Sequence, residues 1–438
     1  MPAALRFSTR FHLVVPVLRL LLCGLSGEAF AASSFVQDRI AIGLWVPPQT
    51  SENLEQRYRE IAEANFTVVI GTAGMAASEQ IALCERFGLK AIVQAPPKLG
   101  DLADGPACWG YLLTDEPNAS AFPDLAVQAD AIRKTRPGRL AYVNLFPNYA
   151  SPAQLGTSTY EEHVARFMKD FKPEVLSMDH YPLMRPDRDT RDAYCANLEV
   201  LRRHALEARI PFWNYFYSMP FNDRTDPTEA QIRWQIFASL AHGAKGVLYF
   251  CYWTPGKGNG GTGEFPKGGA LLTAEGRKTR HYDEARRINA EVRNLGPALM
   301  NLTSTGVQRV ATLSRHRNAE LLPKLTTTEI QSATTQRHAT NGLSAGPLRS
   351  LERVGSDPHS EFLIGSFLHT DGRRAVLMVN QSYAHTAWPT AEFDASPDRI
   401  LEVDKGSGKE APVVDDSPEL PGIQLSFGPG DGRLFILP

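Results

Sequence analysis

The sequence predicts an α/β fold, a (β/α)8 TIM barrel followed by a small C-terminal β-sandwich domain. From residue 39 to about 298, eight short apolar runs alternate with amphipathic segments. The number of runs and their span match one such barrel, which takes roughly 250 residues. After Gly296-Pro297 the helical periodicity stops, and residues 306–438 show alternating strand patterns. We therefore expect a barrel domain over 39–298 and a β-sandwich domain over 306–438.

The eight apolar runs are the expected strands of the barrel. Strands of a parallel sheet are buried on both faces, so they form continuous apolar runs instead of an alternating pattern. The expected strands cover residues 40–46, 66–70, 89–94, 111–113, 140–145, 175–178, 212–216 and 246–252.

Most of the segments between these runs carry apolar residues at helical spacing. Thr228 is a typical N-cap, because Pro227 precedes it and helix-forming residues follow. Residues 96–109 are too few for a normal helix, so we expect a short or irregular third crossover. A doubly wound open sheet would need a Gly-rich dinucleotide turn after an early strand, and the sequence has none. The expected helices cover residues 52–64, 78–87, 124–133, 160–171, 193–208, 228–242 and 280–295.

The C-terminal region has the pattern of an all-β domain. Turn signals such as Asp371-Gly372 separate short alternating runs. Residues near 316–360 are polar and rich in Ser, Thr and Arg, so we expect a long insert or a poorly ordered segment there. The expected strands include residues 362–367, 374–379, 425–427 and 433–437.

Residues 1–31 have the order of a secretory signal peptide. Arg6 and Arg10 precede an apolar stretch that runs roughly from residue 13 to 25, and Ala29-Phe30-Ala31 supplies a small-residue cleavage site. The apolar stretch is short for a membrane span, and a proline and an arginine interrupt it. The sequence therefore predicts an exported protein, periplasmic or extracellular, without a membrane span.

The composition excludes several functional classes. The formal net charge is −2 with both signs mixed, which does not favour a nucleic-acid partner. The sequence has neither a CxxC pair nor an HExxH motif, so we expect no metal site of these kinds. No phosphate-binding loop is present, and we expect no cofactor.

The run Trp109–Pro117 carries the strongest functional signal. Apolar residues lead into Asp115 and Glu116, and Pro117 then ends the expected fourth strand. Active sites of TIM barrels lie at the C-terminal ends of the strands, and carboxylates are seldom buried without a partner or a role. The charge of Asp115 would disfavour ionisation of Glu116 and keep it protonated near neutral pH. A strand that simply ends in solvent is the alternative.

The other strand ends add amides, carboxylates and aromatic residues. Aromatic faces stack on sugar rings, and polar side chains bind their hydroxyls, so this composition is typical of a carbohydrate site; core packing is the alternative for each aromatic residue. Glycoside hydrolysis needs a second carboxyl group besides an acid such as Glu116. The candidates are Trp45, Asn144, Asp179, His180, Tyr181, Trp213, Asn214, Tyr217, Trp253 and Glu264, the last in the Gly-rich loop after the eighth strand.

Several motifs together resemble a known group of enzymes. The barrel resembles the large clan of retaining (β/α)8 glycoside hydrolases, in particular poorly characterised β-galactosidase-like proteins. The resemblance implies that Glu116 is the general acid/base and that Asp115, which replaces the usual Asn, binds the sugar 2-hydroxyl. The matching stretches are Gly110-Tyr111, Asp115-Glu116-Pro117, Asp179-His180-Tyr181-Pro182, residues 249–255 and, more loosely, residues 429–435.

One departure from that clan concerns the nucleophile. The clan carries a Glu at the end of the seventh strand, whereas residues 211–219 contain no carboxylate. Asp179 and Glu264 are the candidates for the second catalytic group. If neither serves, the reaction is inverting, substrate-assisted or absent.

These observations predict an exported glycosidase that acts on a β-galactoside or a related plant or algal polysaccharide or oligosaccharide. The missing carboxylate on the seventh strand motivates an alternative, a non-catalytic carbohydrate-binding barrel. A polysaccharide lyase is a further alternative, because His180 with Tyr181 or Tyr217 could supply its base and acid. The sequence does not specify the sugar, the linkage or the oligomeric state.

Overall fold

The computed structural model describes residues 34–48, 53–71, 74–184, 188–256, 269–315, 346–354 and 359–438. The expected signal peptide, the candidate Glu264 and most of the expected polar insert lie outside these ranges. None of the helices within them is both long enough and apolar enough to cross a membrane.

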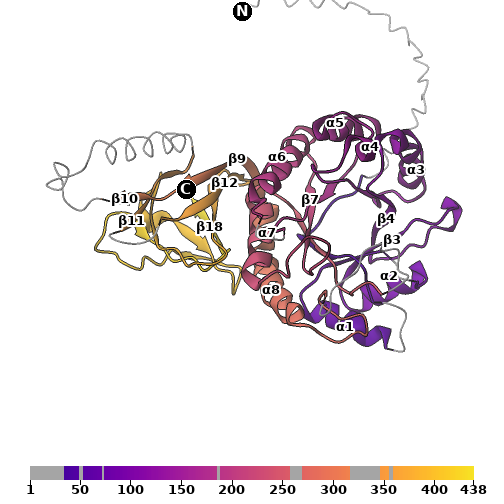
Figure 1. The fold of residues 1–438 in the computed structure, drawn as a ribbon, viewed down its shortest axis with the longest axis horizontal. Coiled ribbons are helices and arrows are strands. Elements are labelled where there is room, and N and C mark those ends of the chain that lie inside the picture. The colour runs from indigo at the N-terminus through magenta and orange to yellow at the C-terminus, as the bar shows by residue number, and fades with distance from the viewer. Residues whose placement is uncertain are drawn as a thin grey trace, which may run out of the picture. The chain divides into compact units, whose positions relative to one another are not determined.

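Eight parallel strands form the predicted barrel. Their order in the sheet is β5-β4-β3-β2-β1-β8-β7-β6, and a parallel bridge between Leu145 and Met178 joins the two outer strands (Figure 1). The strands are β1 (Ala41–Leu44), β2 (Val68–Ile70), β3 (Lys90–Gln94), β4 (Cys108–Asp115), β5 (Leu140–Asn144), β6 (Leu176–Asp179), β7 (Phe212–Tyr217) and β8 (Gly246–Phe250).

Helices surround these strands, as Figure 1 shows. The third crossover holds only the short 3-10 helix η1 (Leu99–Asp101), as the sequence predicts. Thr228 caps α7 in a capping box, its hydroxyl accepting from the Gln231 amide at 3.2 Å. The helices are α1 (Leu54–Glu63), α2 (Ala77–Arg86), η2 (Ala119–Ala121), α3 (Phe122–Thr135), α4 (Pro152–Leu155), α5 (Tyr160–Asp170), α6 (Arg191–Ala208), α7 (Glu229–Ala241) and α8 (Arg280–Met300).

Helix α8 continues past its expected end at residue 295 and contains Pro297. A proline inside a helix removes one hydrogen bond. Here it falls in the last turn, and burial of Leu295 and Leu299 holds that turn against the barrel.

The C-terminal region forms a four-stranded sheet (β10-β11-β14-β17) and a six-stranded sheet (β16-β15-β18-β13-β12-β9). The first strand, β9, begins before the expected residue 306. No strand forms at the expected residues 425–427; the strand β17 ends just before residue 425, and Phe427 makes a single β-bridge. The strands are β9 (Leu302–Ala311), β10 (Leu313–Arg315), β11 (Leu348–Val354), β12 (Glu361–His369), β13 (Arg374–Asn380), β14 (Pro389–Phe393), β15 (Leu401–Val403), β16 (Glu410–Pro412), β17 (Ile423–Gln424) and β18 (Gly432–Leu437), with the 3-10 helix η5 (Pro397–Arg399) before β15.

The six-stranded sheet is buried on both faces. In β13, Val376 and Met378 pack into a core shared by the two sheets, whereas Leu377 and Val379 pack into the core of the barrel. Successive strand residues point to opposite faces, which explains the continuous apolar run. The Trp234 indole of α7 also donates to the Gln381 side chain at 2.8 Å.

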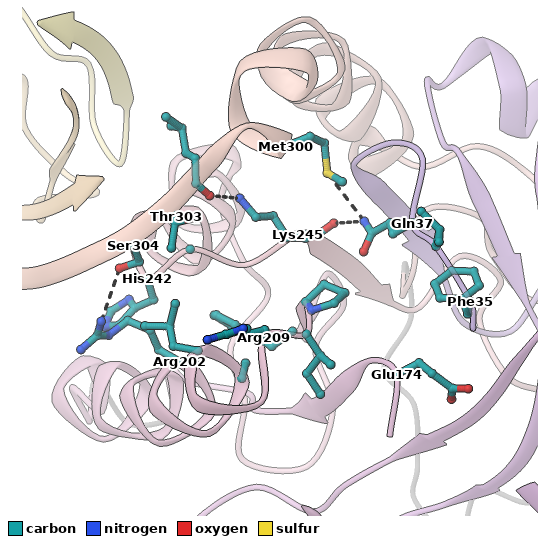
Figure 2. Close-up of a pocket in the computed structure, with 18 residues that line it drawn as sticks. Phe35, Gln37, Glu174, Arg202, Arg209, His242, Lys245, Met300, Thr303 and Ser304 are labelled. Carbon is teal, nitrogen blue, oxygen red and sulfur yellow. Dashed lines mark hydrogen bonds between the residues drawn. The ribbon is translucent and has the colours of Figure 1, made fainter. Parts of the chain in front are cut away.

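A cavity of about 700 Å³ lies at the N-terminal ends of the barrel strands (Figure 2). The Lys245 amine donates to the backbone carbonyls of Leu299 and Leu302, which lie at the end of α8 and the start of β9. Burial lowers the pKa of this amine to about 8. The Lys245 amine is thus already hydrogen-bonded to backbone carbonyls. Since the N-terminal face of a TIM barrel serves stability, the candidate catalytic residues belong to the opposite face.

Candidate active site

The C-terminal ends of the strands surround a cavity of about 180 Å³. It receives residues from β1, β4, β5, β6, β7 and β8, so the strand ends converge as the fold requires. Eight residues line it: Trp45, Asp115, Glu116, Asn144, Asp179, Tyr181, Tyr215 and Phe250.

Both consecutive carboxyl groups of β4 reach this cavity. Asp115 is the last residue of the strand, and Glu116 follows with φ of 46°. Consecutive side chains of a regular strand point to opposite faces, so the left-handed backbone at Glu116 is what brings its side chain to the same cavity. A non-glycine residue in this region is strained by about 1–3 kcal/mol. A hydrogen bond from the Glu116 amide to the Asn144 carbonyl, at 2.9 Å, holds the turn.

Asn144 connects the carboxylates of neighbouring strands. Its Nδ2 donates to Asp115 Oδ1 at 3.1 Å and to Asp179 Oδ1 at 3.0 Å. Its Oδ1 accepts from the Ser177 hydroxyl at 2.9 Å, and Ser177 is in turn hydrogen-bonded to Tyr142 at 2.6 Å. The amide therefore has a fixed orientation and presents both its protons to carboxylates.

The Glu116 and Asp179 carboxyl groups lie close enough that each affects the ionisation of the other. Burial, with the charge of Asp115 added, raises the pKa of Glu116 to about 7. Burial and the charges of Glu116 and Asp115 raise the pKa of Asp179 well above its ordinary value. Desolvation of its carboxyl group also raises the pKa of Asp115 to about 6, although the residue as a whole is exposed. Both carboxyl groups of the Glu116–Asp179 pair therefore hold a proton more readily than a free carboxyl group does.

Aromatic side chains form the walls of the cavity. The Trp45 ring meets Tyr215 edge-on with centroids 5.7 Å apart, and the Tyr181 ring packs on Phe250 at 5.3 Å. Trp45 and Tyr181 are only partly buried. The structure thus brings five further predicted candidates to the cavity besides Glu116, namely Trp45, Asp115, Asn144, Asp179 and Tyr181.

Tyr215 is a lining residue that the sequence interpretation did not select. The residue is only 2% exposed, and its hydroxyl makes no well-oriented hydrogen bond to any described residue. Burial, together with the nearby Tyr142 hydroxyl, raises the pKa of Tyr215 well above its ordinary value. The hydroxyl therefore interacts with that of Tyr142 but is not held by a well-oriented hydrogen bond. Tyr215 pairs with Asp179 in the parallel register of β6 and β7. Its place beside a predicted site residue was the signal that could have selected it.

The structure corrects the expected substrate contacts of Trp213 and Asn214. Trp213 is fully buried inside the barrel, where it stacks on Trp109 and donates to Gln37 Oε1 at 2.9 Å. Asn214 points to the opposite face of β7, and its Nδ2 donates to the Tyr194 hydroxyl of α6 at 2.7 Å. Neither side chain lines the cavity.

The same correction applies to His180, Tyr217 and Trp253. His180 is buried against Asn197, with its Nδ1 2.9 Å from the amide oxygen, and burial lowers its pKa to about 4. Tyr217 and Trp253 each donate to a backbone carbonyl, at 3.2 Å in both cases. These side chains hold loops in place, and the lyase alternative loses His180 as its base.

A metal site finds no support in the described part of the chain. It contains no cluster of three or more His, Cys, Asp or Glu side chains that could hold an ion. The cysteines there are all free.

No family model matches the chain, and no curated protein matches its sequence. Solved structures do match the fold. A polyextremophilic β-galactosidase from the Antarctic haloarchaeon Halorubrum lacusprofundi is 12% identical, with a TM-score of 0.51, over 91% of this chain and 98% of its own. A catalytic mutant of Gan42B, a GH42 β-galactosidase from G. stearothermophilus, is 9% identical, with a TM-score of 0.53, over the same shares. At this identity the likeness concerns the fold, and it confirms the predicted resemblance to β-galactosidase-like barrels.

Proposed function

We propose that the chain is a retaining glycoside hydrolase in which Glu116 is the general acid/base and Asp179 is the nucleophile. One observation carries this proposal. Two carboxyl groups with raised pKa values line a cavity at the C-terminal ends of barrel strands. Glycosidases need one protonated and one ionised carboxyl group at such a place.

The geometry favours retention over inversion. Inverting enzymes keep their carboxyl groups about 6.5–9.5 Å apart to admit a water molecule, whereas retaining enzymes keep them about 5–5.5 Å apart. Glu116 and Asp179 line the same small cavity and affect each other's ionisation, which supports the shorter separation. Binding of a sugar would separate the pair slightly, with the glycosidic oxygen beside Glu116 and the anomeric carbon beside Asp179.

The reaction then runs in two steps. Glu116 protonates the glycosidic oxygen while the Asp179 carboxylate attacks the anomeric carbon, so the leaving group departs and a glycosyl ester forms. Glu116 next removes a proton from water, which attacks the same carbon and frees Asp179. The hydrogen bond from Asn144 holds the Asp179 carboxylate in position for the attack. Asp115 and the Tyr215 hydroxyl bind sugar oxygens.

The substrate we propose is a β-galactoside or a related plant or algal saccharide. Both structural neighbours are described as β-galactosidases. The signal-peptide pattern of residues 1–31 supports export, and the two C-terminal sheets around one apolar core support an accessory β-sandwich over 306–438.

The decisive test is hydrolysis across a panel of aryl glycosides and oligosaccharides. Glu116→Gln should lower kcat/KM by about 10²–10⁴-fold on unactivated substrates. It should lose much less on dinitrophenyl glycosides, whose leaving groups need no protonation. Asp179→Asn should fail on both kinds of substrate. The exposed Glu207→Gln serves as the control and should retain wild-type activity.

Equal activity of wild type and Glu116→Gln on unactivated glycosides would contradict the assignment. Sugar binding without turnover by the wild type would instead favour the non-catalytic carbohydrate-binding barrel, which the absence of a carboxylate on β7 leaves as the second candidate.

The pH profile tests the electrostatic role of Asp115. Activity needs protonated Glu116, so it should fall as the pH rises through the pKa of that group, about 7. Asp115→Asn removes a charge that raises this pKa, so the alkaline limb of kcat/KM should move to lower pH. An unmoved limb, or one that moves to higher pH, would show that Asp115 does not control the acid. The exposed Asp124→Asn is the control for loss of a charge elsewhere.

Tyr215→Phe tests whether the unpaired hydroxyl serves the substrate. Removal of a buried hydroxyl without a good partner should leave the Tm unchanged or raise it. The lost hydrogen bond should lower kcat/KM about tenfold. Tyr252→Phe is the matched control, because its hydroxyl is also buried without a partner but lies outside the cavity. A lower Tm with unchanged kcat/KM in Tyr215→Phe would show a purely structural role.

A further inference from the structure

A second pocket, of about 640 Å³, shares no lining residue with the catalytic cavity. Its walls come from the start of β12, the loop between β13 and β14, and the first residue of α6. It is several times larger than the cavity around Glu116. The side chains that matter for its chemistry are Arg191, Glu361, Gln381, His385 and Trp388.

Trp388 presents its ring to this pocket and to solvent. It is 47% exposed, whereas Trp109, Trp213, Trp234 and Trp253 are buried. Its backbone is held in place, because the Gln424 side chain donates to the Trp388 carbonyl at 2.9 Å and β14 begins at the next residue. A large aromatic ring held half in water at a pocket wall is a ready platform for the apolar face of a ligand ring.

Gln381 supplies a hydrogen-bond donor next to that platform. Its side chain is only 4% exposed, and its Oε1 accepts from the Trp234 indole at 2.8 Å, which fixes the orientation of the amide. No described residue accepts from its Nε2. The Nε2 is not among the buried polar atoms without a partner, so this oriented donor is accessible, and a ligand in the pocket can supply its acceptor.

The charged groups of this pocket are already neutralised. Arg191 pairs with Asp189 at 2.6 Å and stacks on Tyr383 with 5.0 Å to the ring centroid. The Glu361 carboxylate pairs with Arg309. The exposed imidazole of His385 adds a polar group. An aromatic face, an amide donor and paired charges suit a neutral ligand with many hydroxyl groups.

We infer that this pocket is a non-catalytic binding site for a neutral oligosaccharide, with one sugar ring stacked on Trp388 and an oxygen accepting from Gln381 Nε2. The nature of the ligand rests on the proposed glycosidase function, because the site would hold a distant part of the same glycan chain. The physiological substrate is then a polymer or a long oligosaccharide, for which a second site raises the local concentration of chain ends.

The test uses the full chain and native gel electrophoresis in gels containing neutral pectic galactan, agarose or anionic polygalacturonate. At least one neutral polysaccharide should retard the wild type. Trp388→Ala should weaken this retardation about tenfold, and Trp388→Phe should restore part of it. Leu368→Ala is the matched control, because Leu368 is 48% exposed on β12 and lies outside the pocket.

Several outcomes would overturn the inference. These are no retardation by either neutral polysaccharide, retardation by polygalacturonate alone, or equal retardation of wild type and Trp388→Ala. Activity on small aryl glycosides should be the same in Trp388→Ala and wild type, and the Tm of each variant checks its fold. Binding that depends on Trp388 in a protein without glycosidase activity would refute the proposed function and leave the site standing. Glycosidase activity without Trp388-dependent binding would refute the second site and leave the proposed function standing.

Discussion

The interaction between the carboxyl groups of Glu116 and Asp179 is the one on which the proposed site depends. Asp179 is buried and Glu116 is partly buried, and together with Asp115 they form a set whose ionised forms repel one another. A proton on one of these groups relieves that repulsion. Asn144 adds two donated hydrogen bonds, so the carboxylates of β4 and β6 keep fixed positions despite their mutual repulsion.

This arrangement opposes folding at neutral pH. A carboxyl group whose folded pKa lies above its unfolded value makes its full contribution to the free energy of unfolding below the unfolded pKa. That contribution is lost progressively as the pH rises through the folded pKa. For Glu116 that window runs from 4.5 to about 7. The left-handed backbone at Glu116 and the unpaired Tyr215 hydroxyl add further strain at the same place. Costs of this kind cluster where a protein binds or transforms a ligand.

Much of the fold could be predicted because the barrel strands are continuous apolar runs and the helices between them are amphipathic. The position of Asp115 and Glu116 followed from the same pattern, since a polar pair after a buried run must lie at the strand end. The site on β7 could not be predicted in this way. Its sequence Phe-Trp-Asn-Tyr-Phe-Tyr is apolar on both faces, so neither the inward face nor the depth of each side chain was evident. Tyr215 faces the cavity, whereas Trp213 lies deeper inside the barrel and Asn214 faces the helices.

In the proposed mechanism, a carboxyl group on the sixth strand takes the place of the expected carboxylate on the seventh. Neighbouring strands lie about 4.8 Å apart, so a carboxyl group at the end of β6 can approach the same region as one at the end of β7. The register pairs Asp179 with Tyr215, which places a hydroxyl on β7 beside the carboxyl group on β6. In the proposed mechanism Asp179 therefore acts from the strand next to the one that carries the nucleophile in the resembling clan.

Trapping the glycosyl-enzyme tests this claim most directly. The wild type would be incubated with the dinitrophenyl 2-deoxy-2-fluoro derivative of the sugar that it cleaves, digested, and mapped by mass spectrometry. The account predicts one sugar per chain on the peptide that contains Asp179, and none in Asp179→Asn. An adduct on Glu264, or product of inverted configuration without any adduct, would contradict it.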